Sequence, residues 1–498
     1  LEIHADIGFS CAMAGFQAEG SVYVDGLIRC GVHPRRRSID VELVSRDGEV
    51  GFLLEGAANP DFSSSFTANP MGDLSTAGTE PLYEYRGIEV REFSPEVRAL
   101  RVELATLNDL MRSLPAGNPR RARLLRTMSR ALDRLDLHDV VATAGEARVV
   151  LAEGFEPAAA PDSHRLHAVG HAHIDTAWLW PLRETRRKCA RTFSNQVRLM
   201  EEYPEHLFAC SQAAQYEFVR EDHPELFEEI KTLVRQHRWL PVGGMWVEAD
   251  MNLPSGESLV RQLVAGQRYF EEHFGIRCEE IWIPDVFGYP GTLPQIFRAA
   301  GCDRFLTQKL SWNKQNRFPH HSFTWEGIDG STVVAHFPPV DTYNSELSAR
   351  ELTRAAKNFS DAAWSDHSLV PFGYGDGGGG PTAEMLERAR LLADTSGAPS
   401  LGIDPPAAFF ELLEEELEAP GTPRWRGELY FEMHRGTFTT QARTKVGNRR
   451  CEGLLREAEL WDAGGIDESQ ALELDRLWKR VLTQQFHDII PGSSITWV

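Results

Sequence analysis

The sequence lacks any long apolar run. No stretch approaches the roughly 20 consecutive apolar residues that a membrane-spanning helix needs, and the N-terminal residues do not have the basic and apolar regions of a secretion signal. We therefore expect a cytoplasmic protein with no membrane partner. Because the chain begins at Leu1 and not at methionine, this expectation covers only the sequence given.

Paired cysteines are also absent. The seven cysteines are odd in number and scattered, and no two have the spacing of a metal-binding or redox motif. We predict that they are reduced, mostly buried thiols. The seven are Cys11, Cys30, Cys189, Cys210, Cys278, Cys302 and Cys451.

Basic residues are in deficit. Lysine and arginine number 52 against 73 aspartates and glutamates, which gives a net charge of −21. Such a surface repels nucleic acid and anionic lipid, so we expect no nucleic-acid partner and favour a neutral or cationic one. A hydrophobic content of 42% is typical of a globular protein, and a length of 498 residues predicts about three domains.

The first third of the chain divides into two zones. Residues 1–93 contain short β-type runs such as SVYVDGLIRC, separated by turn residues, and predict a small β domain. Residues 94–163 have leucines at helical spacing on both sides of a break at 115–117, and predict a helical linker. Its last part, EPAAAPDS at 156–163, is rich in alanine and proline and is typical of a connecting segment.

Short apolar runs alternate with helical patterns over residues 164–420. The runs include LHAVG, LFACS, WLPVGG, IWIP, RFLTQ, TVVAHF and LVPFG. Repeated strand-then-helix order favours an α/β fold with a parallel sheet, and about seven such units favour a closed or nearly closed barrel. Residues 421–498 return mainly to a helical pattern.

The motif HAHIDTAW follows the first of these runs. His171, His173 and Asp175 recur at every second residue, so on a strand they share one face and can converge on one point. Imidazole and carboxylate groups are ligands that divalent metals such as zinc prefer. The alternative is that the histidines satisfy backbone groups and the aspartate caps a helix.

Polar and aromatic residues follow the later runs in the same way. In α/β barrels the chemistry lies in the loops after the carboxyl ends of the strands. Any one of these residues could be a turn residue or a helix cap, but their joint recurrence favours a site. They are Trp246, Glu248, Asp250, Asp285, Phe287, Tyr289, Lys309, Trp312 and Asp376.

The glycine-rich segment FGYGDGGGG at 372–380 matches the G-x-G-x-x-G pattern of dinucleotide sites. Two further glycines and Pro381 delay the helix that should begin directly over a pyrophosphate, which argues against a nucleotide. Glycines around Asp376 would instead let a ligand approach the backbone while the carboxylate projects into a cleft.

Five segments together resemble a known family. HAHIDTAW, WIPDVFGYPGTLPQIF at 282–297, YGDGGGGPT at 374–382, ELYFEMHRGTFTTQ at 428–441 and QQFHDIIPGSS at 484–494 are similar to glycoside hydrolase family 38 α-mannosidases, of the cytosolic and vacuolar type. The resemblance implies a retaining hydrolase of terminal α-linked mannose in oligosaccharides. It also implies an N-terminal β domain, a (β/α)7 catalytic barrel and the start of a helical bundle.

The resemblance further implies which residues hold a metal and which carry the chemistry. Zinc, or another divalent metal such as cobalt, would be bound by His173, Asp175, Asp285 and His487, with His171 behind them. Asp285 would also be the nucleophile that forms a covalent mannosyl intermediate, and Asp376 the acid/base.

Four residues are expected to bind the sugar. Trp178 would stack on the sugar face, Phe287 would line the same pocket, and Lys309 and Asp488 would contact substrate. In mannose the hydroxyl at carbon 2 is axial, so a metal that chelates the hydroxyls at carbons 2 and 3 would select this configuration.

Two other functions compete with this interpretation. A zinc-dependent amidohydrolase or deacetylase would require further histidines after later strands, and His336 is the candidate. A carbohydrate-binding protein would hold sugar without turning it over.

Family members continue into further domains, whereas this chain ends at Val498. We therefore expect a fragment that binds zinc weakly and has little activity alone, with homo-oligomers formed by the full-length protein.

Overall fold

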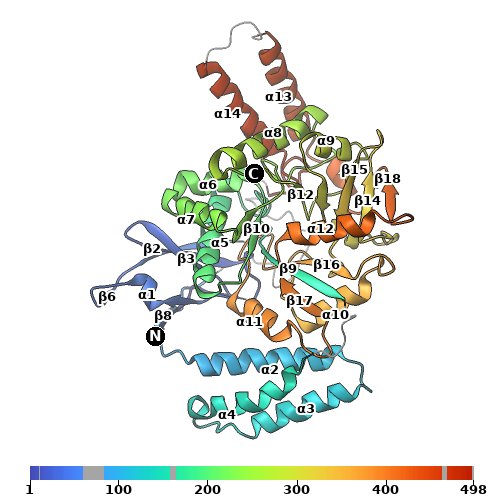
Figure 1. The fold of residues 1–498 in the computed structure, drawn as a ribbon. Helices are drawn as coiled ribbons and strands as arrows, with labels where there is room; N and C mark the ends of the chain where they lie inside the picture. The colour runs from blue at the N-terminus through green and yellow to red at the C-terminus, as the bar shows by residue number, and fades with distance from the viewer. Residues whose placement is uncertain (11, 60–82, 158–163, 462–467, 496–497) are drawn as a thin grey trace.

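The computed structural model describes residues 1–10, 12–59, 83–157, 164–461, 468–495 and 498. Within them the chain has a mixed α/β structure, which confirms the predicted fold class (Figure 1). Cys11 and most of the predicted segment at 156–163 lie outside the described residues. The six described cysteines are free thiols, and all but Cys451 are buried, as predicted.

The N-terminal region consists of strands and the short helix α1 (Val41–Val44). In β1 the alternate residues Ile3 and Ala5 are buried, which is the period of two expected for a sheet with one covered face, whereas β2 is buried along almost its whole length. The three antiparallel groups are β1 (Glu2–Asp6) with β4 (Ser38–Asp40) and β8 (Gly87–Arg91), β2 (Ala18–Val24) with β3 (Leu27–Val32) and β7 (Leu53–Ala58), and β5 (Ser45–Arg46) with β6 (Glu49–Val50).

Three helices follow and form the layer at the bottom of Figure 1. They are α2 (Pro95–Ser113), α3 (Pro119–Leu132) and α4 (Val140–Ala152), with a short 3-10 turn η1 (Glu153–Phe155). Ser94, Asn118 and Asp139 cap them by accepting backbone N–H bonds. Of the leucines at helical spacing, Leu107, Leu110 and Leu124 face the interior, whereas Leu125 and Leu132 are exposed.

The central region contains two five-stranded sheets. The first has the order β11 (Trp239–Pro241), β10 (Phe208–Cys210), β9 (Arg165–His171), β16 (His367–Phe372), with β17 (Ser400–Ile403) beside the first half of β9. The second has the order β12 (Glu280–Trp282), β13 (Arg304–Leu306), β15 (Thr332–His336), β14 (Ser322–Glu326), β18 (Arg424–Arg426). All pairs are parallel except β14 with β15.

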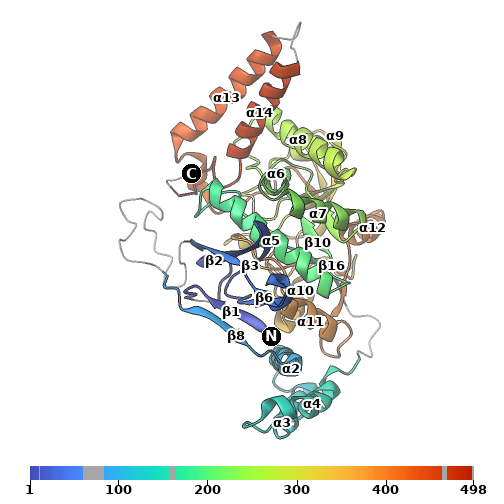
Figure 2. The same ribbon diagram turned by 90° about the vertical axis from the view of Figure 1, so that its left-hand side faces the viewer.

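Helices connect these strands and cover the sheets. They are α5 (Leu182–Glu202), α6 (Ala213–Asp222), α7 (Pro224–Arg235), α8 (Gly256–Phe274), α9 (Leu293–Ala299), η2 (Lys309–Trp312), α10 (Ala349–Asn358), α11 (Ala383–Leu392) and α12 (Pro406–Leu417). In Figure 2, α5 lies between the N-terminal strands and the central region. None of the described helices is both long and apolar enough to cross a membrane.

The predicted (β/α)7 barrel stays a prediction. Among the described residues, no backbone ladder joins β11 to β12 or β15 to β16, so the two sheets do not form one closed ring. The parallel order nevertheless brings the carboxyl ends of the strands together, and the site residues follow from these ends.

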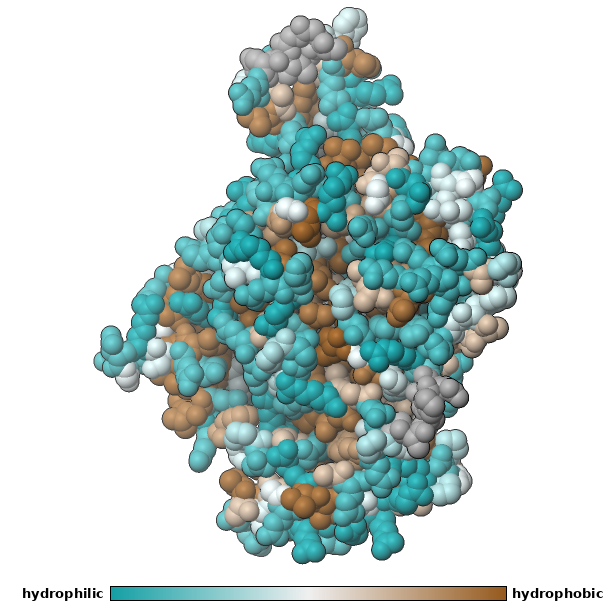
Figure 3. All heavy atoms as spheres, in the orientation of Figure 1, coloured by the Kyte–Doolittle hydropathy of each residue, from teal (hydrophilic) through white to brown (hydrophobic). Residues whose placement is uncertain are grey.

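The C-terminal region is a helical hairpin that projects at the top of Figures 1 and 2. After η3 (Arg435–Phe438) it consists of α13 (Ala442–Trp461) and α14 (Glu468–Gln484). Figure 3 shows hydrophobic side chains among hydrophilic ones on this projection. The exposed apolar residues there are Val446, Leu454, Leu460, Trp461 and Leu472.

Candidate active site

The carboxyl ends of the parallel strands deliver the central residues of the site. β9 ends at His171 and leads into His173 and Asp175, and the segment after β12 carries Asp285. The remaining member, His487, comes from the segment directly after α14. This segment and the end of α14 are fixed to the loop after β11, because Asp250 N–H donates to the Gln485 carbonyl at 2.9 Å and Trp246 Nε1–H donates to Thr483 Oγ1 of α14 at 3.0 Å.

The four predicted metal ligands lie together. One ligand atom from each of His173, Asp175, Asp285 and His487 lies within 4.8 Å of the others, and all four residues are buried. His173 Nε2 is 2.9 Å from Asp175 Oδ1, and His487 Nε2 is 3.3 Å from Asp175 Oδ1 and 3.8 Å from Asp285 Oδ2. The structure therefore gathers residues that are separated by most of the chain.

The chemistry of this donor set fits a divalent cation. His487 donates Nδ1–H to the Glu248 carbonyl at 2.8 Å, which leaves the Nε2 lone pair directed at the cluster. That buried Nε2 has no hydrogen-bond partner among the described residues. Burial alone would lower the pKa of His487, but the nearby carboxylates of Asp175 and Asp488 raise it to about 9. The cluster thus favours a positive charge, and two imidazoles with two carboxylates are a donor set that zinc accepts.

His171 is not part of the cluster. Its Nδ1 is 2.9 Å from the Ala209 carbonyl, and its Nε2 accepts from Trp282 Nε1–H at 3.3 Å. Both ring nitrogens therefore have partners. His171 thus has the structural role that was the alternative to metal binding. Burial lowers the pKa of His171 to about 4, so it is neutral.

The Asp285 carboxylate receives two further contacts. Its Oδ1 accepts from Lys309 Nζ at 2.6 Å and from the Tyr343 hydroxyl at 2.8 Å. Asp285 thus has an ion pair with one neighbour and a hydrogen bond from the other. Lys309, predicted as a substrate contact, is thus paired with Asp285, and its Nζ also lies 4.0 Å from the centre of the Trp312 ring.

Asp376 lies on the other side of Tyr343. The Tyr343 hydroxyl is 2.8 Å from Asp376 Oδ1, the same distance as from Asp285 Oδ1. The Oδ1 atoms of Asp285 and Asp376 therefore lie no more than twice that distance apart. This upper bound fits the carboxylate separation of about 5 to 5.5 Å in retaining glycosidases. Burial and the charges of Asp175 and Asp285 raise the pKa of Asp376 to about 6, which suits a proton donor near neutrality.

Tyr343 and Glu248 were not assigned roles from the sequence. Tyr343 lies in the loop after β15. In this part of the chain the sequence had indicated only His336, which is the last residue of β15, as a candidate. A tyrosine in a loop after a strand was the signal available. Glu248 follows β11, where it was noticed, and its Oε2 lies 3.0 Å from His173 Nδ1, where it orients the imidazole.

Of three further predicted sugar contacts, Phe287 and Asp488 lie beside the cluster. Trp178 is half-buried, with its ring 5.9 Å from Phe16 in a perpendicular arrangement. Phe287 is buried, with its ring 5.8 Å from that of His487. Asp488 accepts a hydrogen bond from Ser493 Oγ, and burial and the charge of Asp175 raise its pKa to about 7. Their roles toward sugar stay predictions.

Several other candidates have structural roles. Asp250 Oδ1 accepts N–H bonds from Asn252 and Leu253 at 2.8 Å, which is a turn cap. Tyr289 donates its hydroxyl to the Val286 carbonyl at 3.0 Å. His336 lies between the sheets, where its Nε2 accepts from Leu369 N–H at 3.2 Å. It therefore does not join the cluster as an amidohydrolase ligand would.

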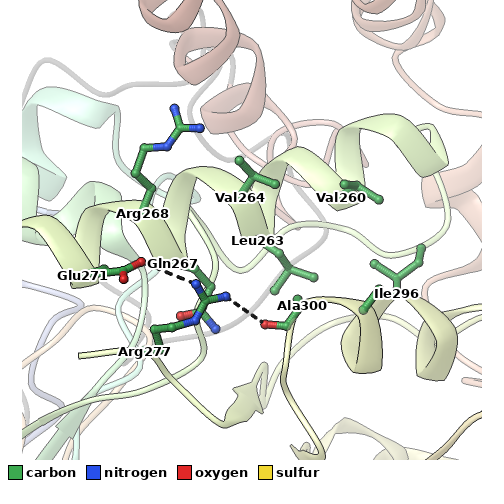
Figure 4. A pocket seen from close by; sticks show the side chains of 10 residues that line it. Val260, Leu263, Val264, Gln267, Arg268, Glu271, Arg277, Ile296 and Ala300 are labelled. Atoms are coloured by element: carbon green, nitrogen blue, oxygen red, sulfur yellow. Dashed lines mark hydrogen bonds and ion pairs between the residues drawn. The ribbon is translucent and has the colours of Figure 1, made fainter. Parts of the chain in front are cut away.

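A separate hollow lies on the surface between α8 and α9 (Figure 4). Val260, Leu263 and Ile296 line it, and Arg277 pairs with Glu271 at its edge at 3.4 Å. None of the predicted site residues lines this hollow. The buried cluster, and not the hollow, is the candidate active site.

Two neighbouring carboxylates beside a metal-type donor set, at the carboxyl ends of parallel strands, are features of a glycoside hydrolase. The Glycosyl hydrolases family 38 N-terminal domain matches residues 163–428, and the Alpha mannosidase middle domain matches residues 432–498. The chain belongs to glycoside hydrolase family 38, as its sequence motifs indicated.

Similar proteins carry related names. The chain is 43% identical to Alpha-mannosidase 2C1 of Homo sapiens over 490 residues, covering 96% of this chain and 46% of that protein. It is 42% identical to Alpha-mannosidase G of Dictyostelium discoideum (91% and 41% covered) and 36% identical to Alpha-mannosidase of Saccharomyces cerevisiae (91% and 44% covered). The chain thus spans less than half the length of these relatives.

Among solved structures, an α-mannosidase from Enterococcus faecalis superimposes with a TM-score of 0.58 at 19% identity, covering 67% of this chain and 40% of that chain. At this identity the likeness establishes the fold alone.

Proposed function

We propose that this chain carries the catalytic site of a retaining, zinc-dependent α-mannosidase that removes terminal α-linked mannose from oligosaccharides. The observation that supports it most is the Tyr343 hydroxyl, which lies 2.8 Å from both Asp285 and Asp376 next to the four-residue donor set. The choice of mannose as the substrate sugar rests on the names of the similar proteins, which are α-mannosidases.

The first half of the reaction uses both carboxylates. Asp285, held in place by Lys309 and Tyr343, attacks the anomeric carbon and forms a bond to it while the glycosidic carbon–oxygen bond breaks. Asp376 gives its proton to the leaving oxygen at the same time. The products are a mannosyl-Asp285 ester and a free hydroxyl on the remaining oligosaccharide.

The second half reverses these roles. Asp376, now a carboxylate, takes a proton from water, the water oxygen bonds to the anomeric carbon, and the ester bond to Asp285 breaks. His173, Asp175, Asp285 and His487 would hold the zinc ion, which when bound supplies a Lewis acid for adjacent sugar hydroxyls. A cobalt ion would fit the same donors.

We also propose that the two sheets complete a (β/α)7 arrangement. Contacts across both gaps support this. Leu369 N–H of β16 donates to the ring of His336 on β15 at 3.2 Å, and Cys278 Sγ, just before β12, donates to the Pro241 carbonyl of β11 at 3.5 Å.

A cytoplasmic location and homo-oligomers of a longer protein are further proposals. Cell fractionation would test the location, and the mass of the native particle would test the oligomeric state.

The decisive experiment traps the intermediate. A fluorinated mannoside with an activated leaving group is incubated with the purified chain, and with any longer natural protein that contains it, and the labelled peptide is identified by mass spectrometry. We expect one mannosyl group on Asp285, with bound zinc near one per chain and turnover that a chelator abolishes.

Other results would favour the competing functions. Chelator-sensitive hydrolysis of amides or acetyl groups without an adduct would identify a metal-dependent amidohydrolase. Mannoside turnover unaffected by Asp285→Ala would remove the nucleophile from the mechanism, and sugar binding without turnover in the longer protein would indicate a binding protein.

A further inference from the structure

One face of α5 holds the loop that carries Asp376. Lys188, Thr192 and Gln196 are spaced by four residues, so they lie in a row along the helix. Lys188 Nζ lies 3.4 Å from the Gly377 carbonyl, and Thr192 Oγ1 accepts from Gly379 N–H at 3.0 Å. Gln196 Nε2 donates to the Gly379 and Pro381 carbonyls at 3.3 and 3.2 Å.

The N-terminal β domain reaches the same loop. A Cβ added at Gly377 would lie 2.6 Å from the carbonyl carbon of Gly15, so these two backbones are in direct contact. Lys188 Nζ donates to the Gly15 carbonyl at 2.8 Å and to Glu19 Oε2 at 2.7 Å. One ammonium group therefore lies between the N-terminal domain and the residue that follows Asp376.

The buried charge of Lys188 is costly to place here. Its side chain is completely buried, and its partners are Glu19, the two carbonyls and the Trp180 ring, whose centre is 4.2 Å from Nζ. A buried ammonium loses its hydration and is tolerated only when several groups replace it. None of these partners belongs to the metal cluster or to the two carboxylates.

Asp376 needs such support. Its φ is +59°, in the left-handed region that non-glycine residues rarely adopt and that surrounding contacts must maintain. Its carbonyl accepts from Asp175 N–H at 2.8 Å on one side, and the Gly377 carbonyl faces Lys188 on the other.

We propose that Lys188 is a positioning residue for Asp376, and that through it the N-terminal β domain is a working part of the active site. This inference rests on the proposed role of Asp376 as the acid/base. Without the ammonium, the loop moves and the carboxyl group no longer meets the leaving oxygen, whereas Asp285 and the metal donors stay in place.

The dependence on leaving group tests this. An α-linked mannobiose needs a proton on its leaving oxygen, but 2,4-dinitrophenolate departs without one. We therefore compare kcat/KM, which reports departure of the leaving group, for both substrates in the zinc-loaded protein. For Lys188→Met and Thr192→Val we expect a loss of about 100-fold on mannobiose and no more than about 3-fold on the dinitrophenyl mannoside.

Two reference variants complete the comparison. Arg187→Met removes the neighbouring ion pair between α5 and the N-terminal domain, Arg187 Nε to Glu55 Oε1 at 3.0 Å, without touching the loop, and should leave both values unchanged. Asp376→Ala should show the same selective loss as Lys188→Met, only larger.

Each outcome supports or overturns the positioning role of Lys188. Equal losses on both substrates, or no loss, in folded Lys188→Met would overturn the positioning role. If Lys188→Met does not fold, although Arg191 still pairs with Glu19 at 3.0 Å, Thr192→Val decides alone. If Asp376→Ala itself is not selective, the acid assignment is wrong and the positioning proposal falls with it, while adduct formation on Asp285 would still stand.

Discussion

Tyr343 links the two carboxylates of the site through one hydroxyl group. A hydroxyl has a single proton, so at any moment it donates either to Asp285 or to Asp376 and only accepts from the other. The proton of Asp376 can therefore be shared with Tyr343 while Tyr343 donates to the Asp285 carboxylate.

We predict that Tyr343→Phe lowers kcat/KM for mannosides about 100-fold, the usual effect of removing one hydrogen-bond donor at a reacting group. The loss should be measured with nitrophenyl and disaccharide substrates. Tyr203→Phe is the control. It removes a hydroxyl that lies outside the site and donates to Glu387 over 2.9 Å, and it should leave kcat/KM unchanged. Equal effects of both substitutions would show that the Tyr343 hydroxyl has no special role.

His487 gives the second residue-scale prediction. His487→Ala removes one of four donors while leaving the carboxylates, so we expect zinc content to fall from near one per chain to well below it and turnover to be lost. Metal analysis by mass spectrometry measures this. His171→Gln is the matched control, because His171 lies outside the donor set; full retention of zinc by His487→Ala would show that this residue is not a ligand.

At the scale of elements, alternation after the first apolar run predicted that His171, His173 and Asp175 converge. His173 and Asp175 do lie together, but β9 ends at His171, whose ring contacts Ala209 and Trp282 instead. Tyr343 and Lys188 could not be found in this way. Tyr343 lies in an irregular loop, and Lys188 matters through contacts with residues 15 and 377, which only the folded chain brings near. The closed barrel was expected from strand-then-helix order, but β14 pairs antiparallel with β15 and several strands have only three residues.

The loop that carries Asp376 gives a prediction at this scale. Gly377→Ala places a Cβ against the backbone of Gly15, so either the loop or the N-terminal domain must shift. We expect a loss of about 2 kcal/mol in stability and a fall in kcat/KM, measured by urea unfolding and by mannobiose hydrolysis. Gly447→Ala on α13, where a Cβ meets nothing within 4 Å, should be neutral or stabilising. Unchanged stability of Gly377→Ala would contradict the close contact.

At the scale of the whole molecule, buried neutral histidines make the folded state sensitive to acid. Burial lowers the pKa of His206 to about 3 and that of His33 to about 4. The unfolded chain binds these protons near its ordinary pKa of about 6.5, so their contribution to stability is complete above that pH and is lost as the pH falls toward the folded values.

We therefore predict that the protein loses at least about 3 kcal/mol of unfolding free energy between pH 7 and pH 4 through such histidines. Urea unfolding at the two pH values measures the loss. His206→Gln should reduce this pH dependence, since glutamine does not titrate and can still donate to Gln196. An identical pH dependence in the variant would mean that His206 does not stay neutral in the folded protein.

The donor set joins His173, early in the central region, to His487, beyond the helical hairpin. During synthesis on a ribosome, the strands that present His173, Asp175 and Asp285 leave the exit tunnel long before α14 does. A nascent chain therefore has three of the four donors, and the set is complete only after the hairpin has been made and has docked. Under the proposed function, a chain that ends before His487 should therefore neither retain the ion nor turn over mannosides.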